Sequence, residues 1–408
     1  MSIKQRLARA VATAIGAASL VSAHADPAAT PGTAAAVPEG GNVASSTAAF
    51  GLSLMQNPSL SEKKKNVFIS PFSISQALSL ALNGAGGETQ AQIRKTLCLG
   101  DVPLEEINKE NGKLLPSLKN PDPKVTLSIA NALWVNKGET LDAGFQQRCH
   151  DFYQAESATL DFSAPSGADT INAWVDKNTQ GKITKIVSQA MLQSSPAVLT
   201  NAIYFHGQWT DAFAKTNTHD ADFTLADGSK KKLPMMVRNG SYSYLATDTF
   251  QAVRLPYGKG RIAMYVFLPK ASGGLDDFIK SATPSAWGSW MKQMHGAQVS
   301  VYLPRFKANY DVTLNDALSA MGMPLAFSQQ ADFAPMGLPK DFIGAVIHKA
   351  TLEVDEEGTV AAAATAVVMA RAALVVPTEI RIDHPFFCAI RDDTTGALLF
   401  AGAIRNPE

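Results

Sequence analysis

Residues 351–378 constrain the fold more than any other part of this chain. A strand-like stretch, 351–357, ends in three consecutive acidic residues, and Gly358 follows it. The side chains after Gly358 are mostly small and include one charge, Arg371. Alanine runs normally favour a helix, but Gly358 at the entry, Pro377 at the exit and several β-branched residues between them oppose one. The sequence therefore predicts a segment that is a loop in one state and a central strand in another.

The N-terminal residues 1–25 have the pattern of a secretory signal. A basic start precedes an apolar run over residues 10–21, and Ala23-His24-Ala25 fits a signal-peptidase site. The apolar run is too short for a membrane anchor. Residues 26–43 are rich in Pro, Ala, Gly and Thr and are expected to form a flexible leader. We expect a secreted, extracellular protein, or a periplasmic one if the host is a bacterium.

The net charge excludes some partners. The whole chain carries 36 basic and 36 acidic residues, and the predicted signal contains three of the basic ones and none of the acidic ones. Its removal leaves 33 against 36, a net charge of −3. No basic cluster is longer than the lysine triplets at 63–65 and 230–232, which we expect in solvated turns. This balance argues against nucleic acid or a membrane surface as partner.

Residues 44–408 are uniform in composition and are expected to form one domain. Three cysteines, Cys98, Cys149 and Cys388, lack metal-ligand spacing and cannot all pair. Three buried or half-buried thiols are favoured, and a single disulfide is the alternative. No metal site, cofactor motif, nucleophile elbow, zinc-protease motif or P-loop is present in the sequence. We expect neither a metal nor a cofactor, and no enzymatic activity.

Helical patterns come early in the chain and strands follow. A helix begins at Ser70-Pro71, where apolar residues recur at helical spacing, and it ends near Gly84. Other helices are expected over 44–56, 88–97 and 167–179. Strands are expected over 125–135, 197–205, 252–256, 262–268, 298–304, 344–354, 380–383, 386–391 and 398–403. This order lacks β–α–β alternation and predicts an α+β fold.

Several separated segments match one family in order and in spacing. They are residues 66–74 (NVFISPFSI), 200–209 (TNAIYFHGQW), 303–306 (LPRF), 331–336 (ADFAPM), 348–350 (HKA), 356–365 (EEGTVAAAAT), 384–387 (HPFF) and 396–407. Through them the chain resembles the serpins, the serine protease inhibitor superfamily, over residues 44–408. The resemblance implies three mostly antiparallel β-sheets, about eight or nine helices and an exposed reactive-centre loop at about 358–378. The alanine-rich start suggests a bacterial-type secreted inhibitory member.

The resemblance also implies a mechanism. A target protease attacks the loop and forms its acyl-enzyme. The cut loop then inserts into the main sheet as a new strand and traps the protease before deacylation. The native fold is therefore expected to be held by kinetics. The alternative is a non-inhibitory serpin-fold protein that binds or carries a ligand.

The hinge of this loop has the residues that insertion requires. It comprises Glu356, Glu357, Gly358, Thr359, Val360, Ala361, Ala362, Ala363, Ala364 and Thr365. Strand alternation turns residues 359, 361, 363 and 365 inward, and none of these is charged or proline. A buried charge or a missing ladder donor at these positions would stall the strand. Val360 departs from the acidic residue common in the family, but it is expected to point outward.

Supporting residues carry over from the family by position. Those that match the shutter cluster, around which the sheet parts, are Ser70, Ser73, Asn201 and His348. Those that match the breach, at the top of the sheet, are Trp209 and the basic–acidic pair Arg305 and Glu356. Without the family, each shutter residue is more often a cap or a satisfied core group, and the Arg305–Glu356 pair a surface coincidence of little energetic weight.

The position of the cleaved bond depends on how it is counted. Family spacing from Gly358 gives Ala372–Ala373, which suits an elastase-like protease and is favoured. A shift of one residue gives Arg371–Ala372 and a trypsin-like protease. Counting back from Pro385 gives Leu374, because this loop is longer than the common length.

Other targets stay open. Met369 or Leu374 would suit a chymotrypsin- or subtilisin-like protease, and the same loop is able to trap a cysteine protease. We expect a monomer that binds neither nucleic acid nor a membrane.

Overall fold

The computed structural model describes residues 42–60, 65–119, 121–359 and 377–407, and all of these belong to one compact unit. The predicted signal, all but the last two residues of the leader, hinge residues 360–365 and the candidate bonds at 371–373 lie outside the described residues. Among the described residues, no helix is long and apolar enough to cross a membrane. Cys98, Cys149 and Cys388 are all free thiols, as favoured.

The described residues form ten α-helices, and several begin at residues that the sequence marks as caps. Asn42 caps the first helix by accepting from Ser45 N–H, and Ser70 caps the second by accepting from Ser73 N–H, with Pro71 in its first turn. The helices are α1 (Val43–Met55), α2 (Pro71–Gly84), α3 (Gly87–Thr96), α4 (Leu104–Lys119), α5 (Ala143–Tyr153), α6 (Pro165–Asn178), α7 (Gln189–Gln193), α8 (Leu275–Ser281), α9 (Pro284–Gln293) and α10 (Asn315–Ala320). Two of the ten, α7 and α10, are short.

The first sheet has six strands in the order β10-β11-β4-β2-β3, with β12 also paired to β4. Its strands are β2 (Val125–Asn136), β3 (Glu156–Leu160), β4 (Ala197–Gln208), β10 (Phe306–Thr313), β11 (Ile343–Val354) and β12 (Gly358–Thr359). The pairs β11–β4 and β2–β3 are parallel, and the others are antiparallel. This mixed sheet carries the site described below.

The remaining strands form one continuous ladder of nine. They are β1 (Val67–Ile69), β5 (His219–Thr224), β6 (Lys230–Ala246), β7 (Phe250–Pro256), β8 (Ile262–Pro269), β9 (His295–Pro304), β13 (Thr378–Arg381), β14 (Phe386–Asp392) and β15 (Leu398–Ile404). The long strand β6 pairs in turn with β5, β9 and β7, so these strands belong to one continuous ladder.

One sequence prediction is wrong in this region. The lysine triplet 230–232 does not lie in a solvated turn but begins β6, where Lys231 pairs with Phe223 and Lys232 with Asp222. Because strand side chains alternate, Lys230 and Lys232 stay exposed while the backbone pairs with β5.

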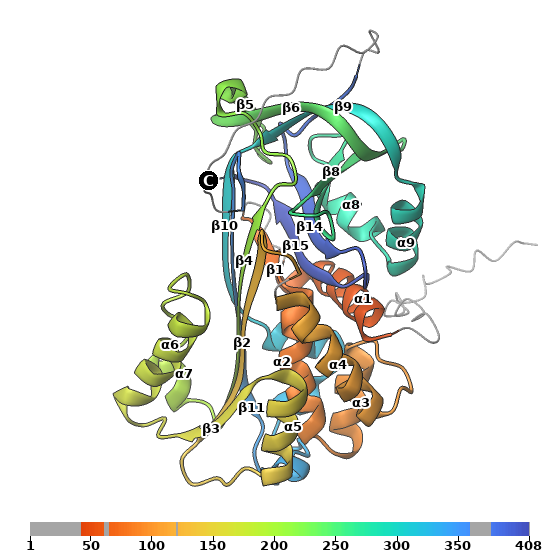
Figure 1. Cartoon of the computed structure of the whole chain (residues 1–408). Helices are drawn as coiled ribbons and strands as arrows, with labels where there is room; N and C mark the ends of the chain where they lie inside the picture. Colours follow the sequence, from red (N-terminus) through yellow and green to blue (C-terminus); the bar gives the residue numbers. More distant parts are fainter. Residues whose placement is uncertain (1–41, 61–64, 120, 360–376, 408) are drawn as a thin grey trace, which may run out of the picture. The chain divides into compact units, whose positions relative to one another are not determined.

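Helices cover both faces of the six-stranded sheet. Figure 1 shows α6 and α7 on one face and α2 and α5 on the other. On the first face, Trp134 and Val198 pack in one cluster with Ile171 and Val175 of α6. On the other face lies α2, which is buried along its whole length. This helix brings Ser73, and its N-cap residue Ser70, to the inner face of the sheet.

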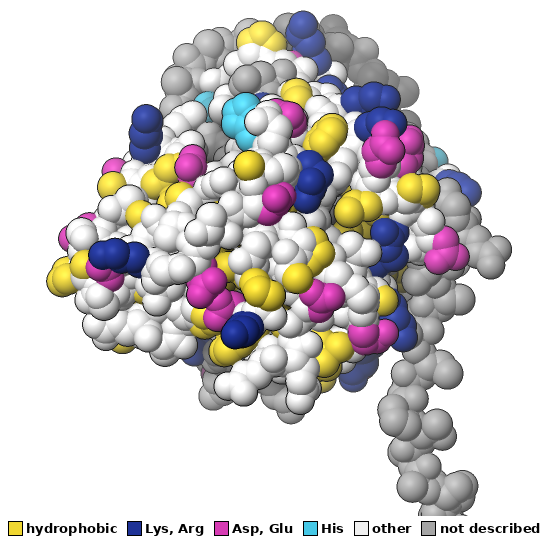
Figure 2. Space-filling model, turned by 90° about the horizontal axis from the view of Figure 1, so that it is seen from below, with side chains coloured by type: hydrophobic (Ala, Val, Ile, Leu, Met, Phe, Trp, Pro, Cys, Tyr) yellow, Lys and Arg dark blue, Asp and Glu magenta, His cyan; other side chains and the backbone are white. Residues whose placement is uncertain are grey.

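The described surface carries mixed charge. Seen from below, acidic and basic side chains are interspersed among uncharged ones (Figure 2). On the described part of this face, neither sign forms a continuous field, in keeping with the near-equal counts of the whole chain.

Candidate functional site

The site lies where β4 and β11 run side by side. Their parallel ladder extends from Ile343 opposite Ala197 up to Thr351 opposite Tyr204. Above this point β12 pairs with β4 instead, with Gly358 opposite Gln208 and Thr359 opposite Gly207. The boundary between β4 and β11, which we call the seam, is therefore closed below and holds the first two residues of the loop at its upper end.

Gly358 and Thr359 fit tightly into this upper end. Gly358 has φ of 146°, and a Cβ there would lie 2.1 Å from the carbonyl oxygen of Gly207. Thr359 is fully buried, and its hydroxyl lies 3.1 Å from the hydroxyl of Tyr257. The side chain of Thr359 thus points inward, as strand alternation predicts.

The three acidic residues before Gly358 form the turn from β11 into β12. The Asp355 carboxylate accepts from Glu357 N–H at 2.9 Å and from Gly358 N–H at 3.2 Å. Burial raises the pKa of Asp355, and the like charges of Glu356 and Glu357 add to that rise. The Asp355 carbonyl accepts from the Trp209 indole N–H at 2.9 Å, so the breach tryptophan holds the turn directly.

Glu356 is 2% exposed and binds two partners, Arg305 and the Thr218 hydroxyl, the latter at 2.7 Å. Burial alone would raise the pKa of Glu356, but the hydrogen bonds from Arg305 and Thr218 hold it below its ordinary value. Lys215 pairs with the neighbouring Glu357 at 2.7 Å. The surface-coincidence interpretation of Arg305 and Glu356 is therefore wrong, because the carboxylate is buried and doubly bonded.

The shutter residues meet across the seam. Ser70, Ser73, Asn201 and His348 are all fully buried. His348 on β11 lies directly opposite Asn201 on β4, and its Nδ1 bonds the amide oxygen of Asn201. A strand entering between β4 and β11 must separate this pair.

The His348 ring has one tautomer that satisfies its neighbours. Its Nε2 accepts from Ser70 N–H at 3.1 Å, so the proton sits on Nδ1 and is donated to Asn201. Burial lowers the pKa of His348 to about 3, so the ring stays neutral. The Asn201 amide in turn donates to Ser73 Oγ and to the oxygen of Asn131.

Sequence reasoning missed Asn131, Thr218, Lys215 and Tyr257. Asn131 carries a detectable signal, since it is a polar residue inside an apolar strand and pairs with Asn201 in the β2–β4 register. The other three meet the hinge only through tertiary packing. Hinge residues 356–359 are placed as described, whereas 360–365 and the candidate bonds at 371–373 lie outside the described residues.

Comparison with known proteins agrees with this architecture. The family model described as "Serpin (serine protease inhibitor)" matches residues 45–407. Mouse leukocyte elastase inhibitor A is 34% identical over 378 residues, which cover 90% of this chain and 99% of the relative. The native structure of Tengpin, a thermophilic serpin, matches with a TM-score of 0.83 at 30% identity and covers 93% of this chain and 97% of its own.

A structure of human thyroxine-binding globulin, complexed with its ligand, also matches with a TM-score of 0.83, at 29% identity over 90% of this chain and 98% of its own. The same fold is thus similar both to a named inhibitor and to a named binding protein. With a family match over nearly the whole chain and a seam that already holds the start of its loop, this protein belongs to the serpin family.

Proposed function

We propose that this chain is an exported inhibitor that traps serine proteases by inserting its cleaved loop into the seam between β4 and β11. The observation that supports it most is the position of β12, whose two residues already pair with β4 inside the six-stranded sheet. A strand that begins here extends along β4 as β4 and β11 separate below it.

The register of β12 indicates how the strand would continue. Gly358 lies opposite Gln208 and Thr359 opposite Gly207, so each further loop residue moves one residue back along β4. The continuation places Thr365 opposite Asn201, where His348 is now bonded. The Thr365 hydroxyl would enter the shutter as the Asn201–His348 pair separates. It would then replace the His348 ring as the polar partner of Asn201.

The target class is proposed from the loop sequence and from a relative. An elastase-like protease cutting Ala372–Ala373 is favoured, in keeping with the similarity to a leukocyte elastase inhibitor. A trypsin-like protease cutting Arg371–Ala372 is the second choice. Export to the extracellular space or to a periplasm is proposed from the signal pattern of residues 1–25.

The competing function is a binding or carrier protein, as the name of thyroxine-binding globulin illustrates. The inward positions of the hinge weigh against it, because residues 359, 361, 363 and 365 are Thr, Ala, Ala and Thr. None of these is charged or bulky enough to prevent insertion.

The test is to incubate the mature chain separately with elastase, trypsin, chymotrypsin and subtilisin. Each mixture is run on a denaturing gel, and the released C-terminal peptide is weighed by mass spectrometry. Trapping predicts a denaturant-resistant band at the summed mass less that peptide, and the peptide would begin at Ala373 for the favoured bond or at Ala372 for the alternative. The same proteases blocked at their active serine are the control and should give no band. Clean cleavage without a band by every protease would favour the carrier function.

A further inference from the structure

Tyr257 borders the buried position of the Thr359 side chain, which we call the slot. Its ring is fully buried and stacks on Trp209, with ring centroids 4.4 Å apart and planes inclined by 11°. A Cβ on Gly207 would lie 2.9 Å from the Tyr257 ring, so the glycine lets the ring approach the backbone opposite Thr359. Burial raises the pKa of Tyr257, so its hydroxyl stays protonated and able to donate.

The hydrogen bond between the Tyr257 and Thr359 hydroxyls, at 3.1 Å, joins two fully buried side chains. Removing one hydroxyl would leave the other buried without this partner, which is costly, whereas removing both leaves two apolar side chains of similar shape. The pair is therefore expected to be coupled energetically.

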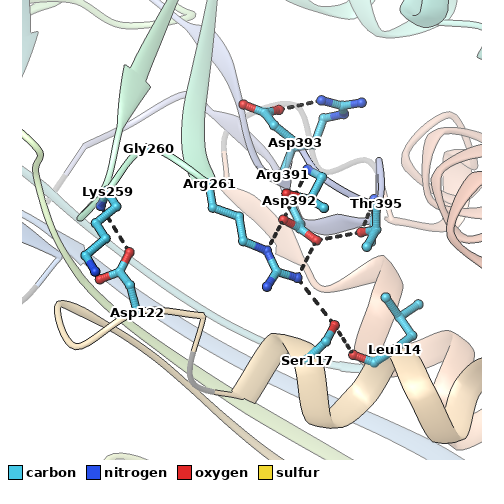
Figure 3. Close-up of polar contacts among 12 residues, drawn as sticks. Leu114, Ser117, Asp122, Lys259, Gly260, Arg261, Arg391, Asp392, Asp393 and Thr395 are labelled. Carbon is cyan, nitrogen blue, oxygen red and sulfur yellow. Dashed lines mark hydrogen bonds and ion pairs between the residues drawn. The ribbon is translucent and has the colours of Figure 1, made fainter.

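The turn after Tyr257 is fixed to β4 and to the segment before β2. Tyr257 N–H donates to Ile262 C=O at 2.8 Å, and Gly258 N–H donates to Gln208 C=O at 2.8 Å. Lys259 N–H donates to the Asp122 carboxylate at 3.1 Å (Figure 3). Gly258 has φ of 52°, and a Cβ there would lie 2.2 Å from Asp122 Oδ2, so the close approach depends on glycine.

The far end of the same turn is anchored independently. Arg261 makes a two-pronged ion pair with Asp392, at 2.8 and 3.0 Å, and also donates to the Ser117 hydroxyl of α4 at 3.3 Å (Figure 3). The Asp392 carboxylate is fully buried and accepts from Thr395 as well. Both ends of the turn are therefore held by contacts that do not involve β12.

We propose that Tyr257 is a positioning residue for loop insertion, which docks Thr359 through its hydroxyl and so sets the fraction of protease encounters that end in trapping. This inference rests on the proposed function. Docking supplies the first pairs of the new strand before cleavage, and the rest of the loop then extends them as β4 and β11 separate. Without docking, the cut loop must first find the slot while deacylation competes.

The test is a double-mutant cycle of Tyr257→Phe and Thr359→Val. Each single variant should slow insertion by about fivefold to a hundredfold, the effect of leaving one buried hydroxyl unpaired. The number of inhibitor molecules consumed per protease trapped should therefore rise several-fold, while the rate of loop cleavage stays within about twofold. The double variant should trap better than the two single losses predict. Additive losses, or singles that trap as well as wild type, would overturn the proposal.

Tyr265→Phe is the matched control. The Tyr265 hydroxyl lies on β8 and donates to Asp393 at 2.7 Å, and its ring is also buried. Losing it should lower stability without changing the number of inhibitor molecules consumed. An equal rise in this control would show that the Tyr257 effect is merely loss of stability.

Hydrogen exchange of the uncleaved chain separates this proposal from the proposed function. Tyr257→Phe should increase exchange in peptides that contain residues 355–359, and Thr359→Val in the same background should add little. If wild type traps no protease, the proposed function fails and this exchange measurement decides the docking claim. Unchanged exchange in Tyr257→Phe would refute it.

Discussion

Under the proposed trapping mechanism, replacing Thr359 by arginine should convert this chain from an inhibitor of its target protease into a substrate. Thr359 is fully buried, its backbone pairs with Gly207 and its hydroxyl lies 3.1 Å from that of Tyr257, and among the described residues no acidic side chain bonds it. An arginine there must either bury an unpaired guanidinium or keep β12 out of the sheet. Burying such a charge costs several kcal/mol, so the arginine is expected to leave the slot and undock the hinge.

The magnitude follows from the competition between insertion and deacylation. If the arginine adds about 3 kcal/mol to the insertion barrier, insertion slows by about 150-fold. Even a tenfold slowing changes the outcome when the two rates are similar. Cleaved product should then replace covalent complex, while the global unfolding free energy changes little because only the two-residue strand β12 is displaced.

The assay is a time course of complex and cleaved bands on a denaturing gel, with equal amounts of wild type and variant. Val360→Arg is the matched control, since the adjacent position is expected to face outward and should tolerate the charge. The reasoning is refuted if Thr359→Arg traps protease as well as wild type does, or if both variants lose trapping equally.

Two further predictions concern the shutter and the breach. The unfolded chain binds a proton at His348 near pH 6.5, whereas the native state does not until about pH 3, so the unfolding free energy should fall as the pH drops through this window, by up to about 1.4 kcal/mol per pH unit. Between pH 7 and 4.5, the melting temperature of His348→Gln should therefore depend less on pH than that of wild type. An equal dependence in both would contradict this origin. Arg305→Ala leaves the buried Glu356 carboxylate with Thr218 alone, and it should lower the unfolding free energy measured by chemical denaturation by about 1–3 kcal/mol. The control Lys307→Ala breaks an exposed pair with Glu353 and should lower it by under about 1 kcal/mol. Equal losses in the two variants would contradict the weight given to the buried pair.

Most strands with an apolar pattern were predictable within a few residues. The predicted 125–135 and 344–354 correspond to β2 and β11, because a strand covered on both faces is apolar along its length. Strand β6 was missed, since a lysine triplet opens it and Asn239-Gly240 has the composition of a turn. Its pairing with β5 and β9 overrides these local preferences.

The residues of the site likewise divide into those that the sequence predicts and those that it does not. Ser70, Asn201 and His348 were found because they match positions of the family's shutter cluster, whereas taken singly each has the pattern of a cap or a core polar residue. Tyr257 follows a predicted strand, 252–256, and has no local pattern that separates it from an ordinary core aromatic. Its meeting with Thr359, which lies 102 positions further along the chain, is a product of tertiary structure.

The most direct test of loop insertion is the melting temperature of the chain after its loop is cut. The loop is nicked with a trace of protease, the protease is removed, and the cut and intact chains are melted side by side. Insertion between β4 and β11 completes ladders on both strands, so the cut chain should melt more than about 10 °C higher. A cut chain that melts at the same temperature as the intact one would contradict insertion and with it the proposed trapping mechanism.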